Sequence, residues 1–168
     1  LNGRYAHTGW QKGLEAAIGV YEQAVKLTPP NSPVRPARLN NLGNALRDRY
    51  ARTGRQEDLE AAIGFYEQAG KLALPDSPDR PARLNNLGNG LRDRHARTGR
   101  LKEMEEAICD FRSACELGAV AAPEDALRAA RNWGRWAMQR QAWAEVDEAC
   151  THGLATGRAL HRRQVRRA

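Results

Sequence analysis

The sequence predicts an all-α protein built as a solenoid of antiparallel helical hairpins. The first observation is a repeat, because LNNLGNALRDRYARTGR at Leu39 returns at Leu84 as LNNLGNGLRDRHARTGR. The period is 45 residues, and 16 of 18 aligned positions, starting from Arg38 and Arg83, are identical. Such periods indicate stacked supersecondary units, each unable to bury its apolar face without neighbours. The second observation is that Ala, Leu, Arg, Glu and Gln dominate the segments between Gly and Pro, without the alternation typical of strands.

The complete unit, residues 35–79, is expected to begin with a helix. Pro36 is favourable in a first helical turn, and Gly54 is a natural helix stop. Residues three or four apart form the apolar stripe of this helix, namely Leu39, Leu42, Leu46 and Tyr50. Gly43, beside that stripe, costs roughly 1 kcal/mol of helix propensity relative to Ala. Its presence, and that of Gly88 one period later, predicts that a neighbouring helix crosses closely.

A second helix is expected from about Glu57 to just before Pro75, and the turn at residues 76–78 leads into the next unit. Its predicted buried face consists of Leu59, Ala62, Ile63, Tyr66, Ala69 and Leu72. Residues 80–124 repeat this hairpin. Residues 125–157 form a divergent unit, in which Trp133-Gly134 replaces the Leu-Gly pair of the earlier units.

Both ends of the array are expected to differ from the centre. Residues 1–34 are expected to be a truncated repeat that begins partway through its leading helix. Its second helix, residues 14–27, should therefore keep an uncovered apolar face. We therefore expect a fragment of a longer protein, whose truncated first unit could support self-association. Residues 158–168 are expected to form a basic helical tail.

Charge and cysteine content narrow the function classes. The formal charge is +7, but five of these charges are arginines of residues 158–168, so the first 157 residues carry only +2. Binding of nucleic acid or an anionic surface is therefore an alternative function confined to the tail. The competing interpretation is that the tail is a helix whose basic face is simply solvated. Three cysteines without a CxxC pair favour reduced thiols in a cytoplasmic protein. No apolar run approaches the 18 residues of a membrane span, so no membrane partner is expected.

The repeat positions resemble the tetratricopeptide repeat, whose signature combines an aromatic or Leu-Gly pair, small residues at helix contacts, an aromatic and a closing Pro. The matching positions are Leu42-Gly43, Ala62, Tyr66, Ala69 and Pro75, repeated as Leu87-Gly88, Ala107, Phe111 and Ala114. The long connectors are similar to the extended repeats of kinesin light chains. The Arg-rich segments LRDRYARTGR and RNWGRWAMQRQAWAE are similar to those of actinobacterial proteins in which such repeats precede a CHAT-type, caspase-like protease domain. The resemblance implies a right-handed solenoid that binds proteins, with any catalysis outside this chain.

The candidate binding residues lie opposite the leucine stripe, where the resemblance implies a concave groove. They are Asn40, Asn41, Asn44, Arg47, Asn85, Asn86, Asn89, Arg92, Arg128, Arg131, Asn132 and Arg135. A carboxamide both donates and accepts hydrogen bonds, so repeated Asn residues could hold the backbone of an extended peptide. The arginines of the last unit favour an acidic segment or a terminal carboxylate. The same Asn residues are also compatible with a purely structural role or with solvation.

The sequence offers no motif for catalysis, a cofactor or a metal. The four histidines have no ligand spacing with the cysteines, and neither GxxxxGK[ST] nor GxGxxG occurs. The three tryptophans of the last unit, Trp133, Trp136 and Trp143, fit core packing better than an exposed platform. We therefore predict an interaction scaffold for a protein or peptide ligand, not an enzyme, with an enzyme fragment as the competing class.

Overall fold

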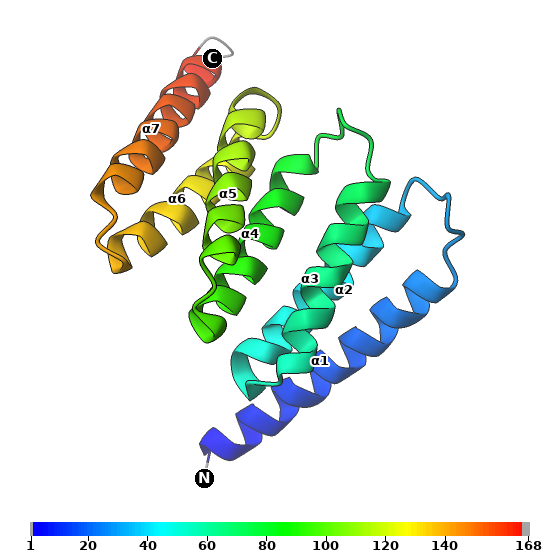
Figure 1. The fold of residues 1–168 in the computed structure, drawn as a ribbon. Coiled ribbons are helices and arrows are strands. Elements are labelled where there is room, and N and C mark those ends of the chain that lie inside the picture. Colours follow the sequence, from blue (N-terminus) through cyan, green and yellow to red (C-terminus); the bar gives the residue numbers. More distant parts are fainter. Residues whose placement is uncertain (1, 166–168) are drawn as a thin grey trace. The chain divides into compact units, whose positions relative to one another are not determined.

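A computed structural model describes residues 2–165, with side chains from residue 11 onwards except that of Gln164. This part of the chain contains no strand, which confirms the predicted all-α class (Figure 1). Its helices are α1 (Asn2–Lys26), α2 (Arg35–Thr53), α3 (Gln56–Leu72), α4 (Arg80–Thr98), α5 (Leu101–Ala121), α6 (Pro123–Gln139) and α7 (Trp143–Val165). The chain divides into two compact units, one with α1–α3 and one with α4–α7.

The predicted hairpin of the first unit is formed by α2 and α3. Gly54 ends α2 in the left-handed region with a φ of 70°, and its N–H donates to the Tyr50 carbonyl at 2.8 Å. Glycine adopts this conformation without steric cost, as expected for a helix stop. In the predicted stripe of α2 the three leucines are buried and Tyr50 is half-buried. The predicted α3 residues are buried except Leu72, which is 48% exposed at the helix end.

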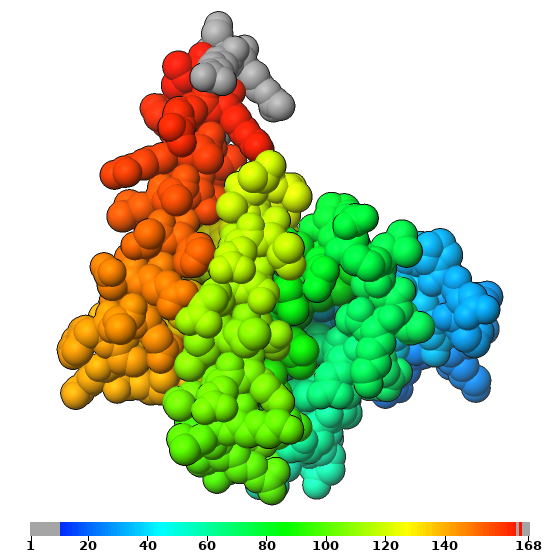
Figure 2. All heavy atoms as spheres, turned by 45° about the horizontal axis from the view of Figure 1, so that its top comes forward, coloured from blue at the N-terminus to red at the C-terminus, as the bar shows by residue number. Residues whose placement is uncertain are grey.

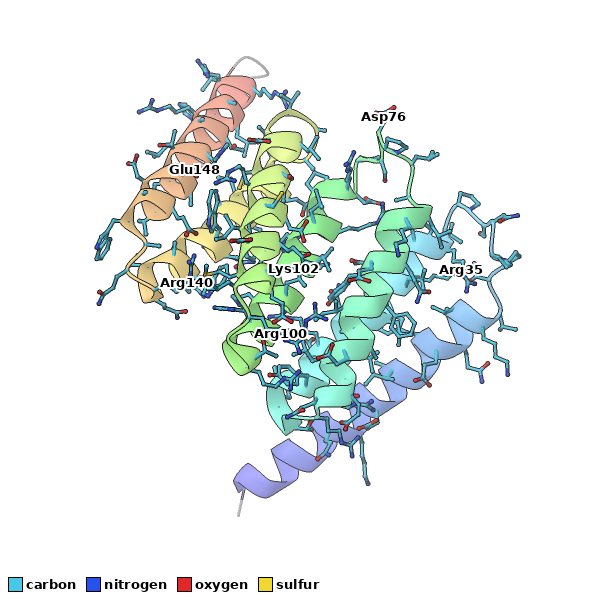
Figure 3. All side chains as sticks on the ribbon, in the orientation of Figure 1. Arg35, Asp76, Arg100, Lys102, Arg140 and Glu148 are labelled. Carbon is cyan, nitrogen blue, oxygen red and sulfur yellow. The ribbon has the colours of Figure 1, made fainter. Side chains whose placement is uncertain are left out.

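Helix α1 packs against α2 in the same unit, with Ile18 buried at the contact. Arginines of α2 satisfy carbonyls at the end of α1, which have no partner within their own helix. Arg35, labelled in Figure 3, donates to Val25 O at 3.0 Å. Arg38 donates to Ala24 O at 3.1 Å. The expected remnant of a leading helix is not a separate element, because residues 2–26 form one continuous helix. Val20 on α1 is 66% exposed.

The second unit contains two hairpins, α4–α5 and α6–α7, and α6 packs against both α4 and α5 (Figure 1). Figure 2 shows α5 and α7 side by side on one face of this unit. The core is made of small residues around a few aromatics, including Ala107, Phe111, Ala114, Ala129 and Trp133, all fully buried. Helix α7 runs through residue 157 to Val165, so the described part of the basic tail continues this helix.

Close helix crossing at Gly43 was predicted from the sequence and is confirmed. A Cβ atom at this position would lie 2.6 Å from Cε1 of the Tyr66 ring. The ring cannot easily move, because Tyr66 is buried and its hydroxyl donates to Asn44 Oδ1 at 2.9 Å. At Gly88 a Cβ would lie 3.2 Å from the Phe111 ring. Glycine at these positions therefore allows a large aromatic of the second helix to pack against the backbone of the first.

We expect Gly43→Ala to lower the free energy of unfolding by about 2 kcal/mol, because overpacking outweighs the gain in helix propensity. Urea denaturation measures this change. The matched control is Gly70→Ala in α3, where a Cβ meets nothing within 4 Å. That variant should gain roughly 0.5–1 kcal/mol. Equal effects of the two substitutions would show that the contact with Tyr66 does not constrain the crossing.

Candidate functional site

The two nearly identical helices α2 and α4 place their Asn residues in different surroundings. In α4, Asn85 and Asn89 are buried, with exposed fractions of 2% and 6%. Asn132 of α6 donates to Asn85 Oδ1 at 2.9 Å, and Asn89 Nδ2 donates to Asn85 O at 2.7 Å. Buried carboxamides require such partners, because an unsatisfied amide costs free energy. The expectation that these two residues line an exposed groove is therefore wrong, because Asn85 joins α4 to α6 and Asn89 bonds within α4.

In α2 the corresponding residues are more accessible. Asn41 is exposed, whereas Asn40, Asn44 and Arg47 are half-buried. The carboxamide oxygen of Asn44 accepts the hydrogen bond from the Tyr66 hydroxyl. Asn44 therefore links α2 to α3 within its own hairpin. Asn86, in the second unit, is half-buried.

A polar groove of about 420 Å³ lies between α4 and α6 and brings three predicted residues together. Its polar lining includes Arg92, Asp93, Asn132, Arg135 and Gln139. Arg92 donates to Asp93 Oδ1 through Nε at 3.0 Å and Nη2 at 2.7 Å. Arg135 is exposed and forms no ion pair with any residue that the structure describes. The groove thus combines one internally paired arginine, one available guanidinium and two carboxamides.

Trp136 and Ala96 form the apolar part of this groove, and Trp136 is only 6% exposed. The Arg140 guanidinium carbon lies 4.0 Å from the Trp136 ring centroid, and the ring meets Phe111 edge-on at 6.3 Å between centroids. Arg140 also pairs with Glu145 at 2.6 Å at the corner between α6 and α7 (Figure 3). Such stacking and pairing fix the ring, so the groove has a rigid wall.

The remaining predicted arginines lie outside the groove. Arg128 is exposed and pairs with Asp125 of its own helix. Arg131 is exposed and lines a second groove, on the side of α6 that faces α7. The candidate binding residues of α6 are thus divided between two surfaces. Sequence reasoning missed Gln139 and Trp136 as lining residues, although their spacing of seven and four from Asn132 matches one helix face.

Core packing was predicted for three tryptophans, and two of them are buried. Trp133 is fully buried, and its Nε1–H donates to Glu145 Oε2 at 2.8 Å. Trp136 is buried as described above, but Trp143 is 64% exposed at the start of α7. The core prediction is therefore wrong for Trp143, because α7 begins there with that side chain outside the hairpin contact.

The cysteines differ in burial. Burial raises the pKa of Cys115 to about 12, while Cys109 and Cys150 are exposed. The thiolate is the reactive form, so a raised pKa suppresses reaction at ordinary pH. We expect two thiols per chain to react rapidly with a maleimide at pH 8, and a third only after denaturation. Mass spectrometry of the labelled native protein counts them, and rapid labelling of Cys115 would contradict the described packing.

Among the residues whose side chains the structure describes, no group of three or more His, Cys, Asp or Glu is placed to hold a metal ion. None of the described helices combines the length and apolar character that crossing a membrane requires. In comparisons with known proteins, no family model matches the chain, and no curated protein matches it.

Proposed function

We propose that this chain is a tetratricopeptide-type interaction scaffold, a right-handed solenoid with a 45-residue period, which binds an acidic peptide between α4 and α6. The observation that carries the proposal is the convergence of Arg92, Asn132 and Arg135 on one groove of about 420 Å³. Charge-assisted hydrogen bonds from a guanidinium to a carboxylate are among the stronger polar interactions in proteins. The groove thus supplies both a charged anchor and neutral carboxamides for peptide backbone groups.

The charges of the groove favour an acidic ligand. Arg92 is neutralised by Asp93 at 2.7 Å, whereas Arg135 is exposed and available to a ligand carboxylate. Ala96, which is exposed, and the small accessible part of Trp136 offer an apolar surface beside this guanidinium. A peptide with a side-chain or terminal carboxylate next to an apolar residue fits these features. We further propose that the scaffold is the cytoplasmic recognition arm of a larger bacterial protein, with a CHAT-type protease as the expected catalytic partner domain.

Selection from a random peptide library tests the proposal. A phage library of nine-residue peptides is selected on the immobilised protein, and enriched sequences are synthesised for calorimetry. We expect enrichment of Asp, Glu or a free terminal carboxylate. Arg135→Ala should weaken the selected peptides about tenfold, the loss of one charge-assisted hydrogen bond. Gln139→Glu should weaken them similarly by charge repulsion.

Arg128→Ala is the matched control, because Arg128 is an exposed arginine of the same helix outside the groove. Its peptide affinity should stay within about twofold of the parent. Selected peptides that tolerate both Arg135→Ala and Gln139→Glu would place binding elsewhere and contradict the proposal. A library that yields no enriched sequence on the folded protein would also contradict it.

A further inference from the structure

The second groove, between α6 and α7, encloses about 600 Å³ and has a mostly apolar lining. Met138 of α6 and Leu154 of α7 line it with exposed fractions of 55% and 61%. Two arginines of α6, Arg131 and Arg135, also line this groove. Exposed apolar side chains gathered in one concave surface are typical of interaction sites. Only Arg135 belongs to the lining of both grooves, so the two surfaces can be altered separately.

The preceding hairpin of the same unit indicates what kind of structure covers this face. When Trp133-Gly134 is aligned with Leu87-Gly88, four of the six α6 residues that line the groove correspond to buried positions of α4. Leu127, Arg131, Gly134 and Arg135 correspond in this order to Pro81, Asn85, Gly88 and Asn89. In the α4–α5 hairpin, helix α6 packs against α4 and bonds Asn85 through Asn132, whereas Gly88 faces Phe111 of α5. The groove on α6–α7 therefore has the form that accepts a helix.

The arginines indicate the charge of that helix. Where α4 carries Asn85 and Asn89, α6 carries Arg131 and Arg135, one helical turn apart and both exposed. Neither forms an ion pair with a residue that the structure describes. Covering a guanidinium without an anionic partner is costly. A second copy docked through this same face would add further arginines to the interface, so charge complementarity favours a different, acidic partner.

We propose that the α6–α7 groove docks an amphipathic helix of a partner protein, whose acidic residue faces Arg131 and Arg135. The apolar side of that helix covers Met138 and Leu154. Its carboxylate takes the position that Asn132 occupies opposite Asn85 in the preceding hairpin. This surface shares only Arg135 with the peptide groove between α4 and α6.

Cys150 provides a reporter, because it lines the groove and is exposed. In a Cys109→Ser background it is the remaining exposed cysteine, since Cys115 is buried. The probes are two synthetic peptides with the sequence of α6, one carrying Asn132→Glu and the other Asn132→Lys. We expect the Glu peptide to slow maleimide modification of Cys150 at least fivefold at saturation. The Lys peptide should require an about tenfold higher concentration for the same protection.

Charge reversal on the protein makes the test specific. Arg131→Glu should invert the preference, so that the Lys peptide protects Cys150 better than the Glu peptide. Unfolding by urea checks that this exposed substitution leaves stability unchanged. Equal protection by both peptides, an uninverted preference, or no protection would overturn the proposal. Protection that rises with protein concentration without peptide would also overturn it, because a second copy would then occupy the groove.

Two variants distinguish binding in the α4–α6 groove from binding in the α6–α7 groove. Gln139 lines only the α4–α6 groove, and Arg131 lines only the α6–α7 groove. Gln139→Glu should weaken the selected acidic peptides and leave helix-peptide protection of Cys150 within twofold. Arg131→Glu should have the opposite pattern. Loss of both activities in either variant would contradict the assignment of two separate sites.

Discussion

Replacement of Trp133 with alanine is expected to lower the free energy of unfolding by about 3–5 kcal/mol, the usual cost of truncating a buried Trp. Trp133 is fully buried, and the Arg112 guanidinium carbon lies 5.4 Å from its ring centroid. Truncation leaves a cavity and removes the hydrogen bond to Glu145. Urea denaturation monitored by far-ultraviolet circular dichroism measures the loss of free energy. In a thermal melt, the same variant should have a melting temperature lower by roughly 10 °C.

Trp143→Ala is the matched control for this prediction. Trp143 is 64% exposed, so its truncation removes little buried surface. The expected change is within about 0.5 kcal/mol, as for most surface substitutions. A loss at Trp133 no larger than that at Trp143 would contradict the described core of the second unit.

The second large effect is expected at Arg49, which joins the three helices of the first unit. Its Nε and Nη2 donate to the two carboxylate oxygens of Asp58 at 2.7 and 2.6 Å, and its Nη1 lies 2.6 Å from Glu15 Oε2. Hydrogen bonding to Asp58 is the main cause that raises the pKa of Arg49. Because Asp58 is only 5% exposed, Arg49→Met would leave a buried carboxylate unpaired. We expect a loss of about 3 kcal/mol in urea denaturation.

Two further variants separate the buried charge from general effects of losing an arginine. Asp58→Asn in the Arg49→Met background should recover more than half of the loss, because the uncompensated charge is removed. Lys102→Met is the exposed control, since Lys102 is 84% exposed and lies 3.7 Å from Glu106. It should change stability by less than about 0.5 kcal/mol. Failure of Asp58→Asn to recover stability would show that the cost does not come from the buried carboxylate.

The sequence was sufficient to predict the helices of the repeats, because their signals are local. Pro36 and Gly54 mark the ends of α2, and Gly43 anticipates the contact with Tyr66. The continuity of α1 could not be read from the repeat alignment, which assigned its first residues to a different helix from the rest.

The candidate site was less predictable, because identical residues acquire roles from what packs against them. Asn85 and Asn89 match Asn40 and Asn44 in sequence, yet only the α4 pair is buried, where Asn132 of α6 meets Asn85. Helix periodicity alone gives the face of a residue, not whether another helix covers that face. For the same reason, the sequence did not distinguish Arg131 from Arg135. Arg131 lines only the α6–α7 groove, whereas Arg135 lines both grooves.

Binding of an acidic peptide between α4 and α6 is the central claim, and its most direct test is to map where such a peptide binds. Peptide selected on the folded protein is titrated into ¹⁵N-labelled protein and followed by heteronuclear NMR. We predict the largest shift changes at Arg92, Asn132, Arg135 and Gln139, and at the indole N–H of Trp136. Shift changes confined to the basic segment 158–165 of α7, with the groove residues unperturbed, would contradict the account.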